Sequence, residues 1–165
     1  MQLKSPVLVL FVFLLTVMPG CTSEDNSSDE EAIPAFSIVA DDGVTYSSEN
    51  LLGTPYVVHF SASWCNNCRP TIHAVDAQLS SHTYIVISTD NSDSEKLSDW
   101  HLQVNESQAG TVDTPFGANA ELAQTLGINN TPTLLLVSSE GLILERHIGT
   151  LTDSSEIDAF WSKAV

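Results

Sequence analysis

Cys65 and Cys68 are the residues of this sequence best suited to chemistry, because two thiols separated by two residues can form a disulfide or ligate a metal. A zinc site would need further ligands, and the sequence has no second cysteine pair. Only scattered histidines could complete it: His59, His73, His82, His101 and His147. A disulfide that closes so short a loop adds little stability. We therefore interpret the pair as redox-active, with no metal and no bound cofactor.

The position of the pair supports redox chemistry. The apolar run at residues 56–60 predicts a buried strand, and a helical pattern follows the second cysteine. Free N–H groups and the dipole at a helix start stabilise a thiolate, and they lower the pKa of the first cysteine from roughly 8.5 to about 3.5–7 in such motifs. We expect Cys65 to be the attacking nucleophile and Cys68 to resolve the mixed disulfide.

Cys21 is the third cysteine, and it follows a segment, residues 1–20, that we interpret as an export signal: Lys4, an apolar run, then Pro19 and Gly20. The apolar run is shorter than the roughly 20 residues that span a bilayer. A small residue directly before a cysteine resembles a bacterial lipoprotein signal, which implies a lipidated Cys21. Ordinary cleavage nearby, giving a soluble periplasmic product, is the alternative. Thr22 resembles an outer-membrane sorting signal in Gram-negative cells.

Charge is strongly acidic, with 5 basic and 21 acidic residues and a net charge of −16. Nucleic acid and anionic membrane surfaces are therefore poor partners. We expect residues 21–33 to form the lipidated cysteine and an acidic, disordered tether, because residues 22–31 combine five acids with Ser and Asn. Residues 34–165 are enough for one domain with a full core and too few for two.

Alternating patterns along this domain predict an α/β sandwich with a mixed sheet. Turn residues separate the periodic segments, and a short helical turn is expected at 48–52. The expected strands are residues 36–39, 44–46, 56–60, 84–87, 133–137 and 142–147, with a weak one near 111–113. The expected helices are residues 72–79, with Ala77 in the apolar stripe, 94–104, 118–126 and 154–163.

Four segments together resemble the thioredoxin superfamily, specifically its envelope TlpA-like and ResA-like oxidoreductases. These segments are the entry hairpin at 36–43, the run at 58–68, the extra helix and strand between 90 and 127, and residues 127–133. The resemblance implies a thioredoxin-like three-layer sandwich with an extra αβ insertion after the first βαβ unit. It also implies that Pro132 is cis beside the cysteines. Thr131 would then offer backbone hydrogen bonds to an extended substrate peptide, and Trp64 would pack on the rim of the site.

His59 stands where thioredoxins keep a buried carboxylate beneath their disulfide. In a strand buried on both faces, its imidazole should be neutral, with a pKa below roughly 6.5. We predict that His59 accepts the proton of Cys68 during resolution. The alternative is a histidine that only satisfies a hydrogen bond of the core. The uncharged Asn66 and Asn67 leave the redox direction open.

We expect a thiol:disulfide oxidoreductase that reduces disulfides of envelope proteins, with a membrane or soluble thiol protein as its electron donor. It would face the periplasm, anchored by lipid, with the outer membrane favoured in Gram-negative bacteria. The alternatives are a disulfide-forming oxidase or isomerase, and a metal chaperone or binding module on the same fold. A measured reduction potential separates the redox directions, since known pairs range from about −270 mV to about −120 mV.

Overall fold

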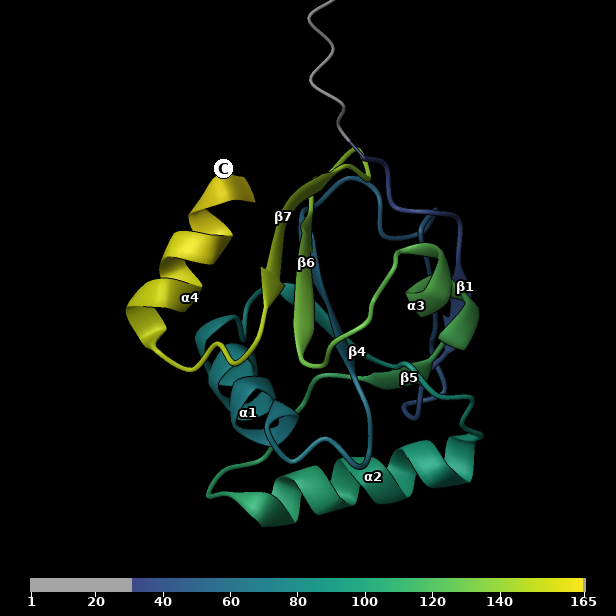
Figure 1. The fold of residues 1–165 in the computed structure, drawn as a ribbon, viewed down its shortest axis with the longest axis vertical. Helices are drawn as coiled ribbons and strands as arrows, with labels where there is room; N and C mark the ends of the chain where they lie inside the picture. The colour runs from purple at the N-terminus through teal and green to yellow at the C-terminus, as the bar shows by residue number, and fades with distance from the viewer. Residues whose placement is uncertain (1–30, 165) are drawn as a thin grey trace, which may run out of the picture.

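The computed structural model describes residues 31–164 (Figure 1). The expected signal, Cys21 and most of the expected tether lie outside these residues. Residues 31–33, which the sequence assigns to the tether, take part in the fold: the N–H of Ile33 donates to Gly141, and the N–H of Ile143 donates to Glu31. The packed domain therefore begins before residue 34.

A five-stranded mixed sheet forms the centre, in the order β5-β4-β3-β6-β7. Its strands are β3 (Tyr56–Ser61), β4 (Thr83–Ser88), β5 (Phe116–Ala118), β6 (Thr133–Val137) and β7 (Ile143–Ile148). β4 runs parallel to β3 and β5, whereas β6 is antiparallel to both β3 and β7. A separate hairpin pairs β1 (Ser37–Val39) with β2 (Thr45–Ser47).

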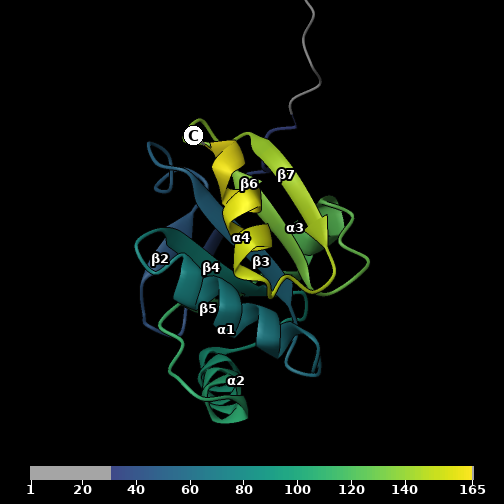
Figure 2. The ribbon, with the colours of Figure 1, turned by 90° about the vertical axis from the view of Figure 1, so that its left-hand side faces the viewer.

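Helices complete three layers around this sheet. They are α1 (Cys68–Gln78), α2 (Ser94–Ser107), α3 (Ala120–Thr125) and α4 (Ser154–Trp161), which ends in a 3₁₀ turn. α1 and α4 cover one face, and α3 lies with the β1-β2 hairpin on the other (Figures 1 and 2). α2 lies across the lower end of the molecule in both views. In residues 31–164 no helix is long and apolar enough to cross a bilayer.

The core explains why the central strands form where the sequence predicts them. All six residues of β3 are buried, as are all five of β6. Alternate side chains of these strands enter two apolar clusters, one on each face of the sheet. Burying a large apolar side chain stabilises a fold by roughly 1.5–3 kcal/mol, so a strand that is apolar at nearly every position belongs at the centre of the sheet.

The predicted weak strand at 111–113 is wrong, and the edge strand is β5 instead. The N–H groups that a strand would use for pairing are bonded to side chains here. The N–H of Val112 donates to Asn105 Oδ1 at 2.7 Å, and those of the next two residues donate to the Asp76 carboxylate at 3.2 and 3.0 Å. Sheet pairing starts only where Phe116 meets Val86.

Three smaller differences have local causes. The third helix begins at Ala120, because Asn119 accepts the N–H of Leu122 and caps it. Ala77 is exposed rather than part of the buried stripe of α1. The same helix begins at Cys68, four residues earlier than predicted. Pro70 is tolerated there because the first N–H groups of a helix have no partner within it.

Candidate redox-active site

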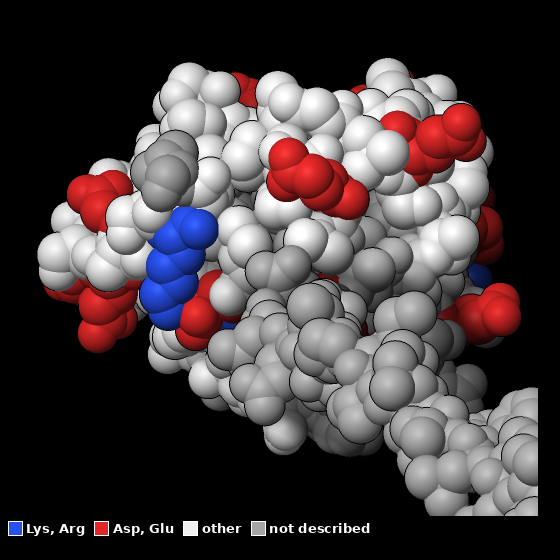
Figure 3. All heavy atoms as spheres, turned by 90° about the horizontal axis from the view of Figure 1, so that it is seen from above, with Lys and Arg blue, Asp and Glu red and all other residues white. Residues whose placement is uncertain are grey.

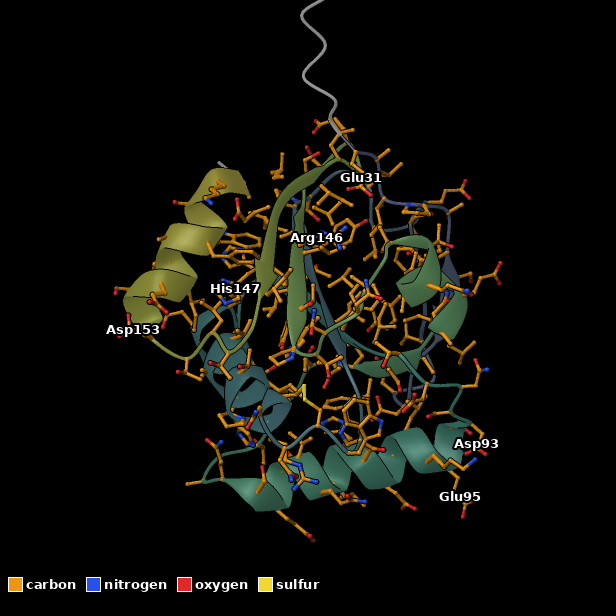
Figure 4. All side chains as sticks on the ribbon, viewed as in Figure 1. Glu31, Asp93, Glu95, Arg146, His147 and Asp153 are labelled. Atoms are coloured by element: carbon orange, nitrogen blue, oxygen red, sulfur yellow. A yellow bond between two sulfur atoms is a disulfide. The ribbon has the colours of Figure 1, made fainter. Side chains whose placement is uncertain are left out.

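The two cysteines form a disulfide at the start of α1, with a sulfur–sulfur distance of 2.07 Å. The yellow bond in Figure 4 marks it, close to α1 and near the end of the molecule that carries α2. The N–H of Cys65 donates to Ala62, and that of Cys68 donates to Cys65, so the chain turns tightly before the helix. Cys65 is 6% exposed and Cys68 is 1% exposed, so Cys65 is the more accessible of the two residues.

The N-terminus of the helix next to this disulfide has no negatively charged or capping side chain to offset the positive end of its dipole. Asn67 precedes α1 without a side-chain capping hydrogen bond, and the first turn of the helix has no acidic residue. The positive end of the helix dipole therefore remains available to a thiolate. This geometry fits the predicted nucleophilic role of Cys65.

Trp64 stands on the rim of the site. Its side chain is 66% exposed, and its Nε1–H donates to Asp90 Oδ2 at 2.9 Å. Asp90 is itself held at the end of β4, where its N–H donates to Ser88 Oγ at 3.1 Å. The indole thus has a fixed orientation beside Cys65 while most of its surface stays open to a partner. The sequence did not identify Asp90, because its contact with Trp64 joins segments 26 residues apart.

Pro132 comes to the same end of the sheet as the cysteines. The Thr131–Pro132 peptide bond is cis. Pro132 is buried, and its carbonyl accepts the N–H of Gly149 at 2.9 Å. Thr133 pairs with Phe60, near the end of the strand that leads to Cys65. The fold therefore brings Pro132 and the cysteines, which are far apart in the sequence, to the same end of the sheet.

His59 lies in the buried strand that precedes the disulfide. Its side chain is 0% exposed, and its Nδ1 is 2.6 Å from the hydroxyl of Tyr84. Burial lowers the pKa of His59 from 6.5 to about 3, which confirms the predicted direction. Burial, and then the charge of Asp76, hold the pKa of Tyr84 well above its usual value. His59 is therefore neutral at physiological pH.

Three side-chain polar atoms of this strand are buried without a partner among the described residues, and two of them, on His59 and Ser61, lie on the same face of the strand. Among residues 31–164, neither His59 Nε2 nor Ser61 Oγ has a hydrogen-bond partner. Buried polar groups are nearly always hydrogen-bonded, so each exception needs an explanation. Ser61 was not identified from the sequence, although its position two residues after His59 places both on one face of a strand.

Comparison with known families decides the identity of the domain. The family model described as a thioredoxin-like domain matches residues 50–164. The chain belongs to the thioredoxin-like family.

Similar curated proteins carry a redox name. The chain is 28% identical over 151 residues to the thiol:disulfide interchange protein DsbE of Xylella fastidiosa (strain Temecula1), covering 87% of this chain and 75% of that protein. It is 28% identical over 138 residues to the protein of the same name in Escherichia coli K12, covering 79% and 72%. This thioredoxin-like chain is a thiol:disulfide oxidoreductase.

Solved structures agree on the fold. A putative protein disulfide isomerase from Bacteroides thetaiotaomicron superimposes with a TM-score of 0.66 at 21% identity, over 81% of this chain and 86% of that one. A thioredoxin-family thiol:disulfide interchange protein from Chlorobium tepidum TLS also gives 0.66, at 22% identity, over 82% and 96%. The predicted thioredoxin-like sandwich, with α2 and β5 as its insertion after the first βαβ unit, is confirmed.

The predicted site residues therefore divide into two groups. Trp64, the two cysteines and Pro132 lie at or near one end of the thioredoxin-like sheet, with His59 in the strand that leads there. Cys21 lies outside the described residues. Within residues 31–164, no group of three or more His, Cys, Asp or Glu side chains is arranged to hold a metal ion.

Proposed function

We propose that this oxidoreductase reduces disulfides of bacterial envelope proteins, with Cys65 as nucleophile and Cys68 as resolving thiol. The observation that carries the division of roles is the different burial of the two cysteines at the helix start: Cys65 retains some exposure, whereas Cys68 is enclosed. An incoming substrate disulfide therefore meets Cys65 first.

Each step of the proposed reaction is a thiolate exchange. The Cys65 thiolate attacks one sulfur of the substrate disulfide, and the other substrate sulfur leaves as a thiolate that takes up a proton. The Cys68 thiolate then attacks Cys65, which releases the second substrate thiolate and forms the Cys65–Cys68 disulfide. Two electrons pass from the dithiol to the substrate, and a membrane or soluble dithiol protein of the envelope restores them.

Substrate docking would use the rim described above. Trp64 offers an exposed aromatic surface, and the backbone of Thr131, next to Pro132, would pair with an extended peptide. Main-chain pairing of this kind tolerates many sequences. It suits an enzyme that acts on several envelope proteins.

Trapping experiments test the two cysteine roles. In a Cys68→Ser variant, mixed disulfides between Cys65 and substrate proteins should accumulate, because nothing resolves them. A Cys65→Ser variant should lose disulfide reduction of insulin by at least a hundredfold. Trapping through Cys68 in the Cys65→Ser variant would contradict the assignment.

The reduction potential tests the direction. A reductase should equilibrate near the thioredoxin value of about −270 mV, whereas a disulfide-forming oxidase should lie near about −120 mV. Equilibration of the purified protein with glutathione mixtures, followed by thiol alkylation, measures it. A value near the oxidising limit would favour the alternative function.

Anchoring belongs to the same proposal. Residues 1–20 would be removed as a signal, lipid would be attached to Cys21, and residues 21–30 would connect the membrane to the domain. The protein would then face the periplasm, on the outer membrane in Gram-negative cells. Mass spectrometry should find a mature N-terminus at Cys21 that carries lipid, and a start at any other residue would contradict this.

A further inference from the structure

The unpaired atoms of β3 lie on the side of the sheet that carries the disulfide. Side chains alternate along a strand, so Val57, His59 and Ser61 share one face. Val57 packs in the same cluster as both cysteines. The cross-strand neighbours of His59, which are Val86 and Leu134, belong to that cluster as well.

The same strand provides a contrast on its other face. The hydroxyl of Tyr56 is also buried without a partner among the described residues. Tyr56 belongs to the second cluster, with Val58 and Phe60. Two unpaired polar groups thus lie on the disulfide side of β3, and one lies on the opposite side.

Tyr84 decides which nitrogen of His59 carries the proton. Its hydroxyl can donate only one hydrogen, and within residues 31–164 its recorded partner is His59 Nδ1. If the hydroxyl donates to Nδ1, the imidazole proton sits on Nε2 and one donor is left unpaired. If Nδ1–H donates instead, both the tyrosine hydrogen and the Nε2 lone pair are left unpaired. The first arrangement leaves fewer buried groups unsatisfied and is favoured.

We propose that His59 Nε2–H and Ser61 Oγ–H form a donor site for the Cys68 thiolate, with Tyr84 as the positioning residue that fixes the His59 tautomer. The proposal rests on the proposed role of Cys68 as the resolving thiol. It assigns the two unpaired groups a partner that exists only when the disulfide is broken. The proton that Cys68 loses passes to the departing substrate thiolate or to solvent.

A thiolate at Cys68 needs such donors. The residue is 1% exposed and packs among buried apolar residues, so burial disfavours a negative charge there. The helix dipole at the first turn of α1 and the positive charge of the neighbouring Arg69 also stabilise this thiolate. Neutral His59, whose pKa burial lowers to about 3, is a weak base but retains a proton to donate on Nε2.

Other titratable groups around the site act at a distance. Asp76 on α1 affects Tyr84 by its charge. β6 carries no ionisable side chain. His147 on β7 has its Nε2 at 3.2 Å from the carbonyl of Thr150, and Glu156 on α4 is exposed. The hydrogen bond to Tyr84 is therefore the contact that sets the tautomer of His59.

Nuclear magnetic resonance tests the tautomer directly. In the ¹⁵N-labelled oxidised protein, long-range ¹H–¹⁵N correlations should show His59 protonated at Nε2 and bare at Nδ1, with the signals assigned by their loss in His59→Gln. A majority of the Nδ1–H form would overturn the donor site. That form would instead leave Nε2 free to accept the proton of Cys68.

Thiolate titration tests the donor site itself. In the full chain with Cys21→Ser and Cys65→Ser, Cys68 is the only thiol, and absorbance at 240 nm reports its ionisation. Tyr84→Phe and Ser61→Ala should each raise the Cys68 pKa by roughly one unit, about a tenfold fall in the acid dissociation constant.

Tyr56→Phe is the matched control for these variants. It removes an unpaired buried hydroxyl from the same strand but on the opposite face, so the Cys68 pKa should stay at the parent value. A Cys68 pKa in either test variant equal to that of Tyr56→Phe would overturn the proposal. If the donor site is wrong, Cys68→Ser should still trap mixed disulfides. An error in the donor site can therefore be distinguished from an error in the proposed cysteine roles.

Discussion

His59 shows how burial alone changes the chemistry of a single residue. An exposed histidine titrates near neutral pH, whereas burial lowers the pKa of this one to about 3. The unfolded chain therefore binds a proton between about pH 3 and pH 6.5 that the native protein does not bind. Its role toward Cys68 stays a prediction, and the tautomer set by Tyr84 distinguishes donor from acceptor.

The depressed pKa of His59 predicts a specific acid sensitivity. The stability that follows from a neutral His59 is fully present above about pH 6.5 and is lost as the pH falls toward 3, by about 1.4 kcal/mol per pH unit. Between pH 7 and pH 5 the loss from this residue should be about 2 kcal/mol. Urea unfolding of the parent and of His59→Gln at both pH values measures it.

The comparison of slopes removes the contribution of other titrating groups. His59→Gln also changes the free energy of unfolding at each pH. The quantity compared is therefore the change in that free energy between the two pH values, in the parent and in the variant. Equal pH dependence in the parent and the variant would show that His59 does not titrate differently in the native and unfolded states.

At the scale of elements, His101 connects the insertion, α2 and β5, to the rest of the domain. From α2, its Nδ1 lies 2.6 Å from Asp41 Oδ2 and its Nε2 lies 2.8 Å from the carbonyl of Val112. Its ring stacks on Phe116, with centroids 4.3 Å apart. The other oxygen of Asp41 accepts the N–H of Phe116 at 2.8 Å. One side-chain pair thus joins α2, β5 and the turn of the β1-β2 hairpin.

Removal of the His101 contacts should destabilise the whole domain. We expect His101→Ala to lower the free energy of unfolding by about 2–4 kcal/mol, because it breaks two hydrogen bonds and leaves the Asp41 carboxylate with an unpaired oxygen. Leu102→Ala, on the exposed side of the same helix, should change it by less than about 0.5 kcal/mol. Denaturant unfolding compares the two. Similar losses in both variants would mean that the His101 contacts do not set the effect.

At the scale of the whole molecule, negative charge dominates the surface. The net charge is −16, and Figure 3 shows acidic side chains spread over the face it presents, with few basic ones among them. Within residues 31–164 the structure contains four ion pairs, which include Lys163 with Glu145 and Arg146 with Glu31. Most acids therefore repel one another without a nearby cation.

Salt should accordingly stabilise this protein. Raising NaCl from about 0.1 M to 1 M shortens the Debye length from roughly 10 Å to 3 Å and screens this repulsion, so the melting temperature should rise by several degrees. A variant with Glu49→Gln, Asp99→Asn and Glu106→Gln, three exposed acids, should respond less. An equal response in both proteins would point to a general salt effect on burial instead of charge repulsion.

The sequence by itself determined the order of the elements and the reactive pair. Turns, strand periods and helix periods are local properties, so the central strands, the four helices and the position of Cys65 and Cys68 at a helix start could all be predicted. The apolar run of β3 also predicted that His59 is buried and neutral. These features depend only on neighbours along the chain.

Only the tertiary structure decided which distant residues meet. Tyr84 reaches His59 because β4 pairs with β3 in one register, and Asp90 reaches Trp64 for a similar reason. The edge strand begins at Phe116 because Asp76, on α1, takes the backbone N–H groups ahead of it. Such contacts depend on strand register and helix docking, which the free energy of the whole core selects, and local periodicity does not encode them.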